Sequence, residues 1–134
     1  HNHLLIKNDI RHTDDIRTLV DDFYSVVCED DMLKNIFVDV MNVNWQHHLP
    51  KMYLFWEKIL FGTGDYEGRP FPPHVAVHQK VNLTPLHFER WLSIFESSVD
   101  KLFEGPKADE IKWRARTIST TWSHKFLYIH SEKE

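Results

Sequence analysis

Four side chains in this sequence could act together on one bound ligand: a tyrosine, two histidines and a tryptophan. His74 follows a loop rich in glycine and proline and stands among apolar residues. A neutral imidazole in such surroundings can coordinate a metal ion while its other ring nitrogen donates a hydrogen bond. Tyr24, His48 and Trp91 each carry an O–H or a ring N–H that could donate to the same ligand.

The composition is rich in aromatic residues and histidines. The chain has 5 Trp, 4 Tyr, 9 Phe and 10 His. Aromatic walls with imidazoles suit a flat, apolar, metal-bearing cofactor such as haem, with His74 as the fifth ligand of the iron. An aromatic-rich core with surface histidines explains the same composition, so both interpretations stay open at this point.

Each candidate residue also has a purely structural interpretation. His74 could be a capping or surface histidine, and His48 a partly buried imidazole that hydrogen-bonds to a backbone carbonyl. Tyr24 and Trp91 lie on or beside helical stripes, where aromatic residues usually belong to the core. His48 is a better pocket candidate than His47, because neighbouring residues on a helix are rotated by about 100°.

Apolar residues recur at steps of three and four over most of the chain, which predicts helices. The predicted helices cover 13 to about 29, with Thr13 as N-cap, 45–61, with Pro50 inside, 85–102, after a Thr84 N-cap, and about 108–130. A short turn at 31–37 and an irregular loop at 62–73 lie between them. Since no convincing alternating strand is present, we expect an all-α fold with a core shared by four main helices.

Length and charge exclude several classes of protein. A chain of 134 residues fits a single domain, in which residues 1–12 would be a short or weakly ordered N-terminal segment. The formal net charge of −4 gives no general attraction to nucleic acids or anionic membranes. No apolar run reaches the roughly 18 residues needed to cross a bilayer. We therefore expect neither nucleic acid nor membrane as a partner.

The cysteine count and the missing motifs narrow the chemistry further. Cys28 is the only cysteine, so the chain forms no internal disulfide and no tetrathiolate metal site, which favours a reducing, cytoplasmic setting and an inert role for this thiol. The HExxH zinc signature, the Walker loop, the dinucleotide glycine pattern and the nucleophile elbow are all absent from the sequence. Hydrolytic and nucleotide chemistry lose most of their support.

The order of the aromatic residues and the loop before His74 resemble the truncated haemoglobins, specifically the group III subfamily, over nearly the whole chain. The matching pieces are Phe23-Tyr24, Ile36-Phe37, Trp45-Gln46-His47-His48, Phe55-Trp56, the run from Gly62 to Pro70, His74 and Phe88-Glu89-Arg90-Trp91-Leu92. The most specific piece is Gly-x-Gly-Asp-Tyr-x-Gly-x-Pro, followed four residues later by histidine.

The resemblance implies a shortened globin in which two helices stack on two around haem, iron protoporphyrin IX. It implies His74 as the proximal iron ligand and Tyr24, His48 and Trp91 as distal hydrogen-bond donors. The residues that it places against the haem or on the pocket wall are Phe23, Phe37, Met52, Phe55 and Trp56. Two departures are visible: Pro72 and Pro73 directly precede His74, and Pro50 could bend the distal helix.

The function implied is that of a haem protein that binds and transports oxygen or another diatomic gas. One alternative is a haem redox enzyme, for nitric oxide dioxygenation or a peroxidase-like reaction, with an unidentified reductase as electron donor. Another is a haem-free helical scaffold, with incidental histidines or a surface zinc cluster. Candidates to meet the haem propionates are Arg69, Lys51 and His78, although solvated surface charge is the default interpretation of each.

Overall fold

The computed structural model describes residues 7–40, 43–63 and 83–133, with side chains for 7–38, 43–63 and 83–125. Its elements are α1 (Thr13–Val27), α2 (Asp31–Lys34), the π-helix η2 (Asn35–Val40), α3 (Trp45–Phe61), α5 (Pro85–Leu102) and α6 (Pro106–Lys133). The described residues form helices and no strand, so the predicted all-α class is confirmed.

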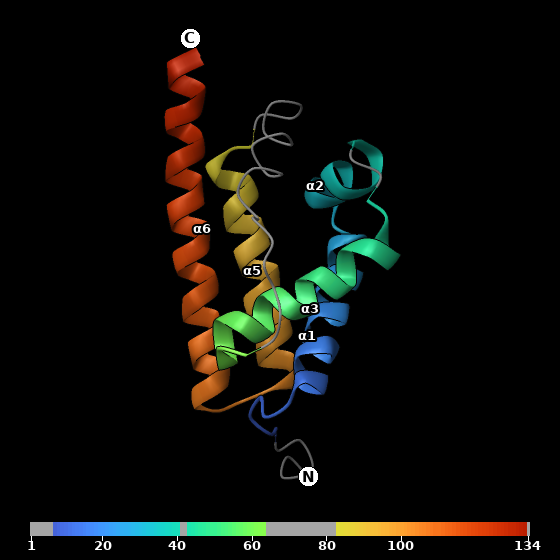
Figure 1. The fold of residues 1–134 in the computed structure, drawn as a ribbon. Coiled ribbons are helices and arrows are strands. Elements are labelled where there is room, and N and C mark those ends of the chain that lie inside the picture. The colour runs from blue at the N-terminus through green and yellow to red at the C-terminus, as the bar shows by residue number, and fades with distance from the viewer. Residues whose placement is uncertain (1–6, 41–42, 64–82, 134) are drawn as a thin grey trace.

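Two pairs of helices make up the molecule. Helices α5 and α6 lie side by side and run in opposite directions, while α3 crosses them and packs on α1 (Figure 1). Helix α1 also contacts α5, and α3 contacts α6, so the two pairs enclose one core. This is the two-on-two arrangement that the family resemblance implies.

Helix α1 presents a fully buried apolar face. Ile16, Leu19 and Val20 are completely inaccessible to solvent, as three-and-four spacing requires of a core-facing stripe. The N-cap is His12 rather than the predicted Thr13, because the Asp15 carboxylate accepts the His12 N–H at 3.1 Å and thereby closes the first turn one residue earlier.

The corner after α1 is helical, whereas the sequence predicts only a short turn there. Asp30 caps α2 by accepting the Leu33 N–H at 3.0 Å, and η2 continues directly from α2. Arg90 Nε on α5 donates to Asp30 Oδ1 over 2.6 Å. Asp30 is buried, so this ion pair fixes the corner against α5. π-Helices are rare in proteins, and those that do occur are often found at functional sites.

Helix α3 has the predicted bounds and continues through Pro50. It ends at Gly62, which takes the left-handed conformation with φ of 73° and donates its N–H to the Lys58 carbonyl over 2.9 Å. The Lys107 ammonium at the start of α6 donates to the Leu60 carbonyl over 3.3 Å, which ties the end of α3 to α6.

Helix α6 begins at Pro106, two residues before the predicted start. The Asp9 carboxylate accepts the N–H groups of Lys107, at 2.9 Å, and Ala108, at 2.8 Å, and so caps the helix from 98 positions away. Burial opposes the charge of Asp9, but these N–H groups outweigh it and lower the pKa of the carboxyl. A Cβ on Gly105 would lie 2.5 Å from Asp9 Cγ, so the cap requires glycine there.

Candidate functional site

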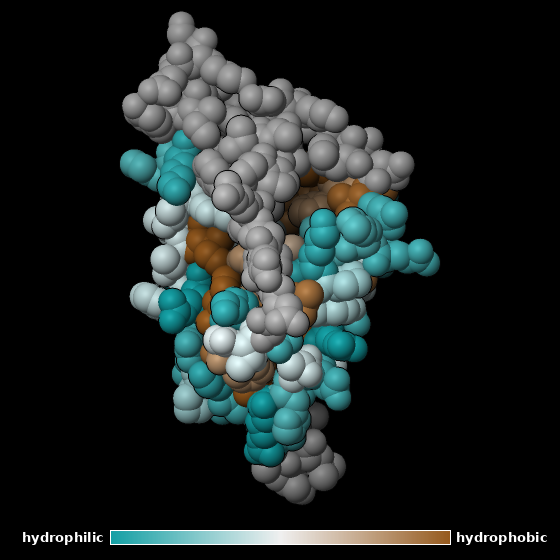
Figure 2. Space-filling view, viewed as in Figure 1, coloured by the Kyte–Doolittle hydropathy of each residue, from teal (hydrophilic) through white to brown (hydrophobic). Residues whose placement is uncertain are grey.

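A cavity of about 290 Å³ lies between the two helix pairs. Its wall is mostly apolar and aromatic and draws on α1, α2, η2, α3, α5 and α6. In the view of Figure 2, apolar residues reach the surface between hydrophilic ones. The lining residues are Tyr24, Leu33, Ile36, Phe37, Val43, His48, Met52, Phe55, Trp56, Leu83, His87, Phe88, Trp91, Ile118, Ser119 and Trp122.

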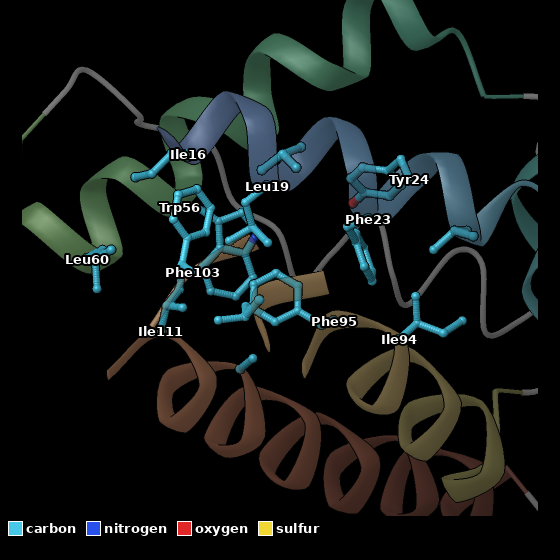
Figure 3. Close-up of a cluster of buried hydrophobic side chains, with 14 of the residues drawn as sticks. Ile16, Leu19, Phe23, Tyr24, Trp56, Leu60, Ile94, Phe95, Phe103 and Ile111 are labelled. Atoms are coloured by element: carbon cyan, nitrogen blue, oxygen red, sulfur yellow. The ribbon is translucent and has the colours of Figure 1, made fainter. Parts of the chain in front are cut away.

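Most of the predicted site residues that the structure describes meet on this wall. They are Tyr24, Phe37, His48, Met52, Phe55, Trp56 and Trp91. Phe23 is not among the lining residues: it is 1% exposed and packs edge-on against Tyr24 and Trp91, with ring centroids at 4.8 and 5.8 Å. Figure 3 shows Phe23 beside Tyr24 on α1, within the buried cluster that contains Phe95. Phe23 therefore supports the wall from behind.

The remaining candidates differ in what the structure shows of them. His74, Arg69 and His78 lie outside the described residues. Lys51 is exposed on α3 and is not among the residues that line the cavity. Cys28 is half-buried, and burial together with neighbouring Glu29 raises the pKa of its thiol.

Tyr24 is the centre of an aromatic cluster on one side of the cavity. Its ring centroid lies 5.2 Å from that of His48, 5.3 Å from Trp45 and 5.8 Å from Phe37. The tyrosine is 7% exposed, and burial raises the pKa of its hydroxyl above the ordinary value of 10. The hydroxyl is therefore protonated at neutral pH and can act as a hydrogen-bond donor.

A stack of three nearly parallel rings forms another part of the site. Trp56 and Trp91 are 6.4 Å apart at an interplanar angle of 21°, and Phe95 lies 4.7 Å from Trp56 and 5.6 Å from Trp91. Such offset stacking holds both indoles in fixed orientations. The indole N–H of Trp91 can donate a hydrogen bond to a ligand, but it cannot accept a hydrogen bond.

Comparison with known proteins identifies the family. Residues 8–124 match the family of bacterial-like globins. A group 3 truncated haemoglobin of Campylobacter jejuni is 32% identical over 111 residues, which cover 78% of this chain and 83% of the relative. The crystal structure of a group III truncated haemoglobin from Campylobacter jejuni superimposes with a TM-score of 0.80 at 27% identity, covering 90% of this chain and 95% of the other. The chain belongs to the group III truncated haemoglobins. The resemblance found in the sequence, and the globin fold that it implied, are thus confirmed.

Several wall residues of this globin have no role in the sequence-based prediction. Ile118 and Trp122 fall four residues apart on α6, a spacing that equally predicts ordinary core residues. Ser119 uses its hydroxyl to donate to the Phe88 carbonyl over 3.1 Å. His87 takes part in the N-terminal cap of α5, because its side chain accepts the backbone N–H of Thr84. The signal in the sequence that could have indicated this role is an N-cap threonine followed three residues later by a side chain that can accept a hydrogen bond.

Two further properties of this globin concern metal ions and membranes. In the part of the chain that the structure describes, no three His, Cys, Asp or Glu side chains lie close enough to hold a metal ion. The surface zinc cluster considered from the sequence therefore has no site among these residues. Within the same described ranges, none of the helices combines the length and the apolar character needed to cross a membrane.

Proposed function

We propose that this globin holds haem in the cavity and binds oxygen or another diatomic gas there. The observation that carries the proposal is the convergence of Tyr24, His48 and Trp91, from three different helices, on one apolar cavity. Three potential hydrogen-bond donors in a mostly hydrophobic wall suit a small polar ligand that must be both enclosed and held by hydrogen bonds.

The wall suits the porphyrin ring as well. Among the lining residues that the structure describes, none is Asp, Glu, Lys or Arg, so a flat apolar group can pack on this part of the wall without desolvating a charge. In this proposal Phe37 packs on one face of the haem, and Met52, Phe55 and Trp56 line its surroundings. His74, which lies outside the described residues, is proposed as the proximal ligand. When bound, haem would supply an iron atom that takes the gas, in the ferrous state, with electrons from a separate reductase.

The protein's part is to place neutral donors where the bound gas gains negative charge. Burial raises the pKa of the Tyr24 hydroxyl further above neutral pH, so the hydroxyl stays protonated, and its ring is fixed by the surrounding aromatic cluster. Trp91 is oriented by its stack with Trp56 and Phe95. Fixed donors stabilise a developing anion without having to reorient. We therefore propose tight binding and slow release of the gas.

Absorption spectra of the ferric, ferrous and carbon monoxide forms test this proposal. We expect a Soret band in the purified protein after expression with sufficient haem, and a shift of that band with carbon monoxide. His74→Ala should change the axial ligation or lose the haem, while His47→Ala, at an exposed position on α3, should leave all three spectra unchanged. A protein that takes up no haem would support the haem-free scaffold instead, and an unchanged His74→Ala spectrum would reassign the proximal ligand.

A further inference from the structure

His87 lines the cavity, but the proposed function gives it no role. It lies in the first turn of α5 and is only half-buried, whereas Tyr24 and Trp56 on the same wall are 7% and 2% exposed. Phe37, His48 and Trp91 on the same wall are half-buried as well. His87 is therefore a polar wall residue that solvent can reach.

The cap of α5 determines which nitrogen of His87 carries the proton. The backbone N–H of Thr84 donates to His87 Nδ1 over 3.0 Å, and the Thr84 hydroxyl lies 3.0 Å from the same nitrogen. Because a backbone N–H can only donate, Nδ1 is an acceptor and the neutral ring carries its proton on Nε2. Burial lowers the pKa of His87 below 6.5, which keeps the ring neutral at neutral pH. The ring edge turned away from the cap is thus a hydrogen-bond donor.

A donor on a wall residue that solvent can reach suits an acceptor on the polar edge of the occupant. Ionised carboxylates are strongly disfavoured among apolar walls, so the carboxylates of a bound tetrapyrrole must lie at the opening, where water reaches them. We infer that His87 Nε2–H donates a hydrogen bond to a haem propionate, an inference that rests on the proposed binding of haem. Lys51, a candidate for this contact from the sequence, is not among the described residues that line the cavity.

Two substitutions separate this contact from the helix cap. Glu and Gln are the usual residues at the third position of a helix, where either accepts the N-cap N–H, so His87→Glu and His87→Gln both keep the bond from Thr84. Of the two, only Gln also has an N–H that can donate to the haem propionate. Glu instead places a negative charge beside the negative charge of the propionate. Matching unfolding midpoints of the haem-free wild type and both variants would verify that the cap is intact.

The test measures how fast each protein loses haem to an excess of apomyoglobin, once with haem and once with haem dimethyl ester, whose propionates carry no charge. With haem, His87→Glu should lose the cofactor on the order of tenfold faster than wild type, and His87→Gln at a rate close to wild type. With the ester, the three rates should converge.

Two results would overturn the inference while leaving haem binding in place. The first is a His87→Glu variant that loses haem no faster than wild type. The second is an equal acceleration with haem and with its ester, because the effect would then come from packing or the cap and not from a carboxylate. A wild type without a Soret band would refute the proposed function itself, and this contact with it.

Discussion

Replacing Tyr24 with phenylalanine isolates the donor on which the proposed function most depends. The substitution removes one hydroxyl and retains the ring, whose centroid lies 4.8 Å from Phe23, 5.2 Å from His48 and 5.8 Å from Phe37. Burial raises the pKa of the Tyr24 hydroxyl, as expected for a phenol among apolar side chains. We therefore expect Tyr24→Phe to change ligand binding more than folding.

The size of the effect follows from the strength of one hydrogen bond to a partly charged acceptor, about 1.5–3 kcal/mol. Since about 1.4 kcal/mol corresponds to a factor of ten, the oxygen dissociation rate should rise about tenfold to a hundredfold if Tyr24 acts alone. His48 and Trp91 line the same cavity and can donate in its place, so the expected result lies at or below the lower end of this range, severalfold to about tenfold.

Displacement of oxygen by carbon monoxide in a stopped-flow instrument measures this rate. Tyr53→Phe is the matched control, because the Tyr53 hydroxyl donates to Asp21 and its ring does not line the cavity. The control should dissociate oxygen at the wild-type rate. An unchanged rate in Tyr24→Phe would remove this tyrosine from the donor set, and an equal acceleration in Tyr53→Phe would show that the effect is not local to the cavity.

Three other substitutions test the site and the contacts that hold it. Trp91→Phe removes the indole donor and keeps an aromatic ring, so it should also accelerate oxygen dissociation, and an unaltered rate would assign this residue to packing alone. Gly105→Ala should lower the free energy of unfolding in urea by about 1–3 kcal/mol, because Gly105 has φ of 146° and the new Cβ meets Asp9; an unchanged midpoint would contradict the cap. Burial opposes the charge of Asp30, but Arg90 and the N–H groups of Leu33 and Met32 together outweigh it and lower the pKa of the carboxyl below 3.8. The charged carboxylate therefore stabilises the fold above this value, and less as the pH falls through the lower, folded-state pKa. Asp30→Asn should thus cost about 1–3 kcal/mol at neutral pH and less near pH 3, and a pH-independent loss would refute the assignment.

The helices were largely predictable because their signals are local. The bounds of α3 and α5 match the periodicity of the sequence and the Thr84 and Gly62 end signals. The start of α6 could not be predicted in this way, because its N-terminal cap is the side chain of Asp9, which lies at the other end of the chain. The corner at α2 and η2 was missed for a similar reason: Arg90 on α5 helps to hold its first residue in place.

The candidate site divides in the same way. The resemblance to the truncated haemoglobins selected Tyr24, His48 and Trp91, and all three line the cavity. Sequence reasoning could not separate Phe23, which packs behind the wall, from residues on the wall itself. It also could not distinguish Trp122 from an ordinary core residue, because a helical stripe shows which face is apolar but not what that face contacts.

The sequence by itself determined the helical class, the family and the residue types available for a ligand, because periodicity and the Gly-x-Gly-Asp-Tyr-x-Gly-x-Pro loop are properties of the linear chain. Only the tertiary structure decided where the apolar faces fail to close on one another and leave a cavity. It also decided which nitrogen of His87 carries a proton, since that depends on a hydrogen bond. Packing and protonation depend on neighbours in space, and local patterns in the linear sequence do not show which residues become neighbours.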